Sequence, residues 1–222
     1  MELIVKIRPL ILTTTLALAS AGAVQADIID YDNDPSAFID ATGAETLTGA
    51  LPDFGSASQG TSITLGDATL TADKDIFVGS YYTSERNSIA ISGPENLDIA
   101  INVGESTSFG FWFMEPIGST ARLDGCNVTS GCIDSTFEIG FYLGGTFMGS
   151  TTFNGVNDDW RFYGITPGYV FDEIRFTETI GSAENEFFGE MYVAKVPEPG
   201  TLALLGIGLV GAGFARRRKK AE

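Results

Sequence analysis

The sequence predicts an all-β fold: one antiparallel β-sandwich, or jelly roll, with a single short helix near its start. Short runs rich in β-branched and aromatic residues recur about every ten residues, separated by Gly, Asn, Asp, Ser and Pro. Several runs alternate apolar and polar residues, as strands with one face on a core do. The sequence shows no repeat of fixed length, which a propeller or a β-helix would require.

The helix is expected over residues 35–42. Asp34 can act as its N-cap, and the proline that follows suits the first helical turn. Gly43 can adopt the left-handed conformation that ends a helix. Within this helix, Phe38 and Ile39 are expected to face the core.

Eleven strands are expected after the helix, over residues 61–65, 68–72, 76–82, 88–92, 97–103, 107–114, 136–143, 146–153, 160–166, 171–178 and 187–194. The run over 136–143 places four apolar side chains on one face: Phe137, Ile139, Phe141 and Leu143. The run over 160–166 separates two sets in the same way: Trp160, Phe162 and Gly164 from Arg161, Tyr163 and Ile165.

Residues 1–26 have the three parts of a secretory signal peptide. Cations such as Lys6 give a positive start, residues 10–23 are mostly apolar, and small residues precede Asp27. We therefore expect cleavage between Ala26 and Asp27. The apolar run is shorter than the ~20 residues of a membrane span, which disfavours a permanent N-terminal anchor.

The body of the chain, residues 27–196, is strongly acidic. It holds six basic and 26 acidic side chains, a net charge of −20. A field of this sign repels phosphate backbones and anionic lipid, so the sequence argues against nucleic acid as a partner. We expect the body to be one domain, long enough to bury a sizeable core and soluble outside the cell.

The chain has two cysteines, Cys126 and Cys132, and no histidine. In an exported protein such a close pair is expected to form a disulfide, which would stabilise the fold by roughly 2–2.5 kcal/mol. The lack of histidine excludes Ser–His–Asp and Cys–His nucleophilic systems and His-ligated zinc.

Clustered acidic residues near the start of the body raise a weaker hypothesis of calcium binding. Asp30, Asp32 and Asp34 lie in "DYDNDP", and hard cations prefer such oxygen ligands. However, Pro35 stands where an EF-hand loop has its turn glycine, and Asp34 is also the expected helix cap. No other cofactor is expected.

A sugar-binding function would use exposed aromatic rings as platforms. Most aromatic residues of this chain alternate as core residues do, and packing explains them. Tyr82, Trp112 and Tyr163 are the candidates for exposure.

A carbohydrate-active enzyme would need two carboxylates roughly 5–9.5 Å apart in a cleft. The candidates are Glu184, Glu186 and Glu190, and Asp172 with Glu173. Adjacent residues of one strand point to opposite faces, so the last two cannot form a facing pair. We interpret all five as solvated loop or strand-edge charges, and we expect no enzyme.

Residues 197–222 consist of three parts. They are the motif Pro197, Glu198 and Pro199, an apolar segment over 202–215, and a cationic end that begins with Arg216, Arg217 and Arg218. The apolar segment contains a Gly-x-Gly-x-x-Gly pattern, but the chain ends too soon for the βαβ unit of a dinucleotide site. As a helix it would be about 21 Å long against a hydrocarbon core of ~30 Å, a marginal membrane span.

These three parts, in this order at the C-terminus, resemble the PEP-CTERM sorting signal of exported Gram-negative bacterial proteins. The resemblance implies export by the secretion machinery and recognition by exosortase, a membrane peptidase or transpeptidase that cuts near the Pro-Glu-Pro motif. It also implies transient anchoring in the inner membrane by the C-terminal helix, and then a place at the cell surface or in the medium. More loosely, "AFIDATG" and "WRFYGITPGYVFDEIRF" resemble β-sandwich domains that precede such tails.

Proteins with such tails are commonly associated with exopolysaccharide, biofilm or the cell envelope. The leading hypothesis is therefore an exported, exosortase-processed, non-enzymatic protein of the envelope or extracellular matrix, with exopolysaccharide as a candidate partner. The alternatives are a lectin-like polysaccharide-binding module, with or without calcium, and a carbohydrate-active enzyme.

Overall fold

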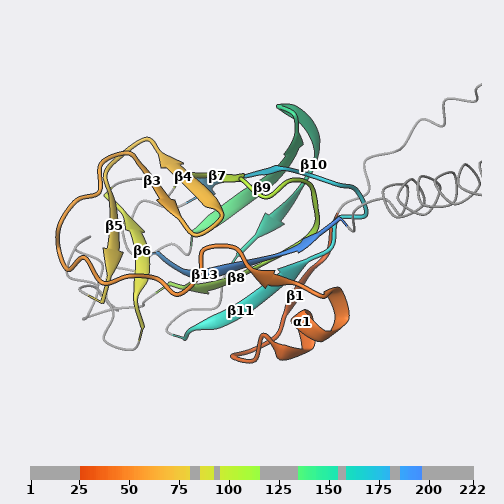
Figure 1. The fold of residues 1–222 in the computed structure, drawn as a ribbon, viewed down its shortest axis with the longest axis horizontal. Helices are drawn as coiled ribbons and strands as arrows, with labels where there is room; N and C mark the ends of the chain where they lie inside the picture. Colours follow the sequence, from red (N-terminus) through yellow and green to blue (C-terminus); the bar gives the residue numbers. More distant parts are fainter. Residues whose placement is uncertain are drawn as a thin grey trace, which may run out of the picture.

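The structure, a computed structural model, describes residues 26–80, 86–92, 96–115, 135–154, 159–180 and 186–196. They fold into two antiparallel sheets packed face to face, with one helix outside them (Figure 1). The predicted all-β sandwich with a short N-terminal helix is confirmed.

The first sheet, called the A sheet, has seven strands. Six follow the order β1-β11-β8-β13-β6-β5, and β2 pairs with β13. Their bounds are β1 Ile28–Asp30, β2 Glu45–Thr46, β5 Ile76–Gly79, β6 Ser88–Ile91, β8 Ser106–Met114, β11 Arg161–Ile165 and β13 Phe187–Lys195. The two longest strands, β8 and β13, pair at its centre, so most of the sheet is built around them.

The second sheet, called the B sheet, has six strands in the order β10-β9-β12-β7-β4-β3. Their bounds are β3 Ser62–Leu65, β4 Ala68–Ala72, β7 Leu97–Ile101, β9 Thr136–Leu143, β10 Thr146–Phe153 and β12 Glu173–Ile180. The hairpin of β9 and β10 turns at Gly144 and Gly145, whose φ angles are 55° and 76°. Two consecutive positive φ angles favour glycine and match the twist of the flanking strands.

All eleven strands expected from the sequence are present, and β4, β9 and β10 have the expected bounds. Two strands were not foreseen, β1 and β2. They have three and two residues, too few to show an alternating pattern, and only their pairing with β11 and β13 defines them.

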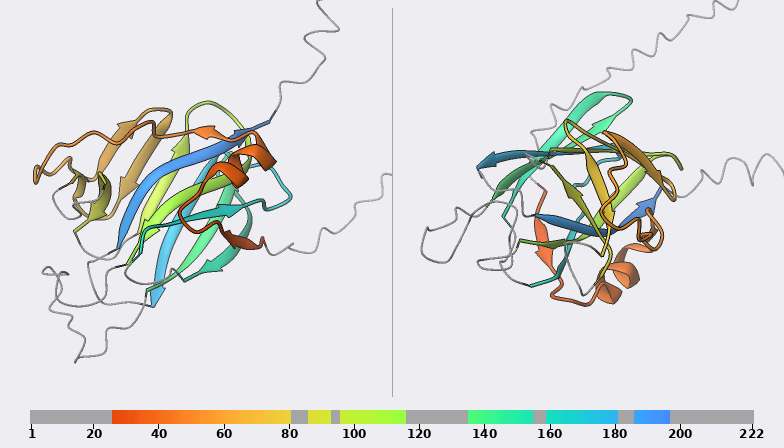
Figure 2. Two further views of the ribbon diagram at one scale, coloured as in Figure 1. Left: turned by 90° about the horizontal axis from the view of Figure 1, so that it is seen from below. Right: turned by 90° about the vertical axis from the view of Figure 1, so that its left-hand side faces the viewer.

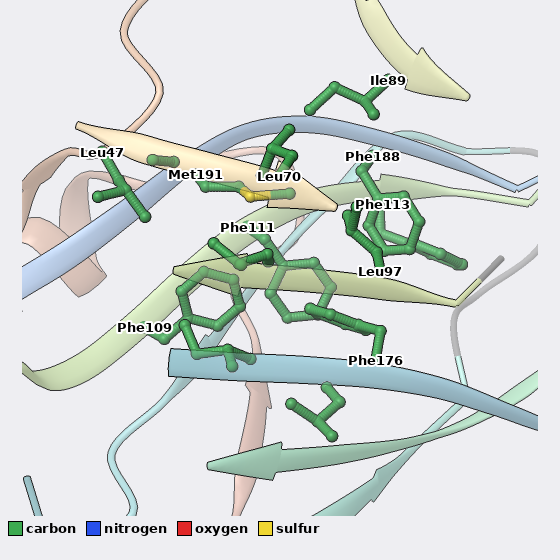
Figure 3. Packing of buried hydrophobic residues seen from close by; sticks show 14 of the residues in the cluster. Leu47, Leu70, Ile89, Leu97, Phe109, Phe111, Phe113, Phe176, Phe188 and Met191 are labelled. Carbon is green, nitrogen blue, oxygen red and sulfur yellow. The ribbon is translucent and has the colours of Figure 1, made fainter. Parts of the chain in front are cut away.

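The core between the sheets is rich in phenylalanine. Phe109, Phe111 and Phe113 are the inward residues of β8, and all three are fully buried (Figure 3). Phe111 meets Phe176 of the B sheet with ring centroids 5.1 Å apart at 79°, the edge-to-face geometry that aromatic pairs prefer. Burying one such side chain contributes about 1.5–3 kcal/mol, so these rings hold the two sheets together.

A second group of buried residues lies on the outer face of the A sheet, away from the B sheet. We call it the outer aromatic cluster; its buried members are Phe38, Ala44, Ala90, Trp112, Trp160, Phe162, Phe187 and Ala194. The helix α1, Ser36–Thr42, lies outside the sandwich on this side (Figures 1 and 2). Its Phe38 packs into the cluster. A Cβ at Gly164 would lie 2.5 Å from Phe38 Cδ2, so glycine lets the ring approach the strand closely.

The ends of α1 follow the expected chemistry. Asp34 Oδ1 accepts a hydrogen bond of 2.9 Å from the Ser36 N–H. Gly43 is left-handed, with φ of 69°, and its N–H donates to the Ile39 carbonyl. The assigned helix begins at Ser36, which puts the N-cap formally at Pro35, one residue later than expected. However, Pro35 already has helical φ and ψ angles and Asp34 supplies the capping oxygen, so Asp34 acts as the cap that the sequence predicts. Phe38 is buried as expected, whereas Ile39 is only partly buried.

Candidate functional site

The outer face of the B sheet is open and polar, and no described element covers it. Its side chains line up across the strands because paired residues of neighbouring strands point to the same face, although a register shift interrupts the β9–β10 pair between Phe147 and Gly149. One row runs Ser62, Thr71, Asp98, Arg175, Gly140 and Ser150; the next runs Thr64, Thr69, Ala100, Glu173, Tyr142 and Phe147. Residues distant in the sequence are thus brought together on one surface.

A groove of about 270 Å³ lies on this face, and we call it the B-sheet groove. It is lined by Thr71, Ala72, Asp73, Asn96, Asp98, Tyr142, Arg175, Phe176 and Thr177. These residues come from β4, β7, β9 and β12 and from the ends of β4 and β7. Most of them present hydroxyl, amide, carboxylate or guanidinium groups, so the groove can exchange hydrogen bonds with a polar ligand.

Arg175 is fixed at the centre of the groove by two contacts. Its Nε donates to Glu173 Oε1 over 2.6 Å, and this hydrogen bond raises the pKa of the guanidinium. Its guanidinium carbon lies 4.1 Å from the centre of the Tyr142 ring, in cation–π geometry. The two contacts hold the remaining N–H groups of Arg175 in a set orientation.

Asp98 differs from the other groove carboxylates. Burial raises its pKa, and the positive charge of Arg175 offsets this only in part. Within the described part of the chain, no hydrogen bond or ion pair to the Asp98 carboxylate is found. Asp73, by contrast, accepts a hydrogen bond of 3.3 Å from Asn96 Nδ2. Asp98 is therefore the carboxylate with capacity for a ligand.

An aromatic pair stands beside the groove. Phe147 is 53% exposed, and its ring centroid lies 5.5 Å from that of the partly buried Tyr142. Gly140 lies next to both rings: a Cβ there would be 3.1 Å from Tyr142 Cε2 and 3.7 Å from Phe147 Cε2. The small residue leaves room for the rings to lie over the strand.

The candidate calcium residues do not form a metal site in the structure. Asp30 and Asp32 both pair with the guanidinium of Arg161 across β1 and β11, and Asp34 accepts the Ser36 N–H. Among the described residues there is no group of three or more acidic, cysteine or histidine side chains that could hold a metal ion. The cation that pairs with Asp30 and Asp32 is therefore the guanidinium of Arg161.

The aromatic candidates for a sugar platform were wrong where the structure tests them. Trp112 is 6% exposed and Tyr163 is 4% exposed. Both faces of β8 and β11 are covered, by the B sheet on one side and by the outer aromatic cluster on the other, so neither ring reaches a ligand. Tyr82 lies outside the described residues.

The candidate carboxylates of an enzyme are dispersed. Glu186 is buried and accepts a hydrogen bond from Ser135 Oγ, so it is not the solvated charge that we expected. Glu190 pairs with Arg86 over 3.4 Å, and Asp172 accepts the Gly144 N–H over 3.0 Å. Glu173 is the one that borders the groove. Glu184 lies outside the described residues.

Two groups of predicted site residues, the cysteine pair and the sorting motif, lie outside the described residues: Cys126, Cys132, Pro197, Glu198, Pro199, Arg216, Arg217 and Arg218. At the expected signal cleavage site, Ala26 is 3% exposed and packs at the edge of the core, while Asp27 is exposed. Cleavage there would therefore have to precede folding. Among the described residues, the one helix is too short to cross a membrane.

Sequence reasoning missed the groove itself. Its outward residues are visible as the polar positions of alternating runs, such as Asp98 in "LDIAI" and Arg175 in "EIRFT". That signal shows which residues leave the core, but not which strands lie side by side.

Comparison with protein families identifies the end of the chain. Residues 195–219 match the model of the PEP-CTERM protein-sorting motif, so the chain is an exported protein directed to exosortase. The match begins at Lys195, the last residue of β13, and the next residue, Val196, still donates its N–H to the Glu105 carbonyl over 2.9 Å. The motif thus follows the sandwich directly. No curated protein and no solved structure matches the chain.

Proposed function

We propose that the protein is a non-enzymatic component of the cell envelope or extracellular matrix, and that the B-sheet groove binds polysaccharide there. The sorting motif supports this destination, because it directs the chain to exosortase. Transient anchoring in the inner membrane and later release or display at the surface belong to the same proposal. The observation that carries the binding function is the exposed Phe147 ring, packed against the partly buried Tyr142, beside a polar groove.

A sugar ring has an apolar face and an edge of hydroxyl groups, and the groove offers a partner for each. The Tyr142 and Phe147 rings offer apolar surface, while Arg175, Asn96 and Asp98 offer donors and acceptors. Arg175 and Asn96 are already held by contacts within the protein, so binding would order few side chains. This arrangement also suits the open sheet, since a polymer can extend past both ends of a short groove.

The proposal can be tested with the full-length chain, purified in a mild detergent, on a glycan array and then by calorimetry with the oligosaccharides that bind. Tyr142→Ala should weaken binding by about tenfold, since aromatic contacts of this kind contribute on the order of 1 kcal/mol or more. Thr64→Ala, on the same face but outside the groove lining, is the control and should bind as the wild type does. Binding to no glycan, or equal binding by wild type and Tyr142→Ala, would disprove the proposal.

The sorting step has its own test. Replacing Pro197, Glu198 and Pro199 with alanine should leave the unprocessed protein in the inner membrane, which cell fractionation and immunoblotting would detect. The wild-type chain in cells lacking exosortase is the matched control and should accumulate in the same form. Normal processing and release of the triple variant would contradict this part of the proposal.

A further inference from the structure

The charges around the B-sheet groove are unbalanced. Asp73 and Asp98 line it and Glu173 borders it, whereas Arg175 is the one cationic side chain among the lining residues. The charge of Arg175 is already met by Glu173 over 2.6 Å. With these four groups ionised, the site therefore carries a net negative charge.

Asp73 and Asp98 both lack a counter-charge at contact distance, and Asp98, unlike Asp73, also accepts no hydrogen bond among the described residues. Asp98 stands directly across from Arg175 in the sheet, yet Arg175 makes its ion pair with Glu173 instead. Asn96 donates to Asp73 and accepts the Glu178 N–H, so this amide is also engaged. Asp98 is exposed, so its carboxylate can accept charge-assisted hydrogen bonds from a ligand that brings a positive charge and N–H donors.

The field of the whole domain has the same sign as the groove. Residues 27–196 carry a net charge of −20, so an anionic polysaccharide is repelled both at long range and at the site. A neutral polysaccharide gains nothing from the field. A polymer with ammonium groups is attracted in both respects, and its charge complements that of the groove.

We propose that the groove binds a polysaccharide whose sugar rings carry protonated amino groups, with the Asp98 carboxylate accepting a hydrogen bond from the ammonium and Tyr142 contacting the apolar face of a ring. This inference rests on the proposed polysaccharide-binding function and names its ligand class. The groove of about 270 Å³ is smaller than the ~300–1,000 Å³ typical of small-molecule pockets, which suits a short part of a chain rather than a whole ligand.

Three oligosaccharides of equal length separate the ligand classes: a glucosamine hexamer, an N-acetylglucosamine hexamer and a galacturonate hexamer. Calorimetry with the full-length chain in mild detergent, at a pH where the amine is protonated, should give the tightest binding to the glucosamine hexamer and the weakest to the galacturonate hexamer. Asp98→Asn should weaken binding of the glucosamine hexamer by about tenfold and leave the N-acetylglucosamine hexamer unaffected.

Asp40→Asn is the matched control, because it makes the same charge change at an exposed position of α1, on the other side of the sandwich. An equal loss in both variants would assign the effect to the general field and overturn the role of Asp98. Equal wild-type affinity for the amine and its acetylated form, or a preference for galacturonate, would overturn the ligand class while leaving polysaccharide binding in place. Binding of none of the three would overturn both proposals for these sugars.

Discussion

On the outer face of the A sheet, glycines alternate with aromatic rings, whereas on the outer face of the B sheet threonines stand beside charged side chains. Gly110 and Gly164 make space for Phe38 and Phe162, and Gly189 does so for Trp112. This face is therefore covered by α1 and by the outer aromatic cluster.

The outer face of the B sheet has no such cover among the described residues. Its cross-strand neighbours include hydroxyl pairs such as Thr64 and Thr69, whose oxygen atoms lie 3.3 Å apart, and the ion pair of Glu173 with Arg175. These groups satisfy one another and remain compatible with water. The two faces of one sandwich therefore differ according to the side chains on their strands: glycine admits a second layer, and polar rows leave the face open to solvent.

Removing one aromatic ring from each face should give the largest difference in stability between the two faces. Phe38→Ala should lower the free energy of unfolding by about 3–5 kcal/mol, because it removes a buried ring and leaves a cavity under α1. Phe147→Ala should change it by less than about 0.5 kcal/mol, because the ring is half in solvent. Urea unfolding of both variants measures the difference. Similar losses in the two would mean that the B-sheet face is as covered as the A-sheet face.

The next largest difference in stability should come from replacing one glycine on each face with alanine. Gly164→Ala should destabilise the fold by about 1–3 kcal/mol, because its Cβ would lie 2.5 Å from Phe38 and 2.8 Å from Tyr31. Gly140→Ala should stay within about 0.5 kcal/mol of the wild type, since its nearest neighbour is the partly buried Tyr142 ring at 3.1 Å, which needs to move only slightly. Thermal melts would rank them, and a more stable Gly164→Ala variant would show that α1 does not pack closely.

Replacing one arginine on each face should give a smaller difference in stability. Arg86 lies 3.7 Å from the centre of the Trp112 ring, against the outer aromatic cluster, and pairs with Glu190. Arg86→Ala should cost about 1–2 kcal/mol of unfolding free energy, whereas Arg175→Ala, on the more exposed face, should cost about 1 kcal/mol or less. The second variant should instead reduce glycan binding. If Arg86→Ala reduced binding and Arg175→Ala did not, the binding surface would be assigned to the wrong face.

Alternation along each strand made the fold predictable. Runs such as "TFEIGFYL" show which residues share a face, and the structure buries Phe137, Ile139 and Phe141 together. The pattern says nothing about whether the opposite face is also covered. Trp112 and Tyr163 were misjudged for this reason: both are buried, one under the outer aromatic cluster and the other between the sheets.

The groove could not be predicted from the sequence because it depends on strand order. Thr71, Asp98, Arg175 and Gly140 come from four separate strands and become neighbours only through the pairing of β4 with β7, β7 with β12 and β12 with β9. One sequence does not disclose these long-range pairings. The C-terminal motif, by contrast, was readable because its parts are contiguous and need no partner strand.

The smallest difference in stability between the two faces should come from two carboxylates, Asp34 and Asp98. Their pKa values are shifted in opposite directions. Hydrogen bonds from Ser36 lower the pKa of Asp34, at the start of the helix that covers the A sheet, whereas burial raises the pKa of Asp98 on the B sheet. With a lowered pKa, Asp34 contributes stability above the ordinary value of 3.8, and this is lost as the pH falls through its folded pKa. With a raised pKa, Asp98 is favourable in its protonated form, and stability is lost as the pH rises from 3.8 through its folded pKa.

Replacing each aspartate with asparagine should therefore change the pH dependence of stability, and the two changes should have opposite signs. Asp34→Asn should lower stability at neutral pH relative to acid, whereas Asp98→Asn should raise it slightly, because the desolvated charge is gone while the shape is kept. Urea midpoints measured from about pH 3 to pH 7 for both variants and the wild type would show the two differences. The side-chain oxygen of asparagine can still accept a hydrogen bond from the Ser36 N–H. Asp34→Asn therefore tests the loss of the charge while the capping hydrogen bond is kept. Differences of the same sign in both variants would mean that Asp98 has a counter-charge within the protein, and its carboxylate would then not be available to a cationic ligand.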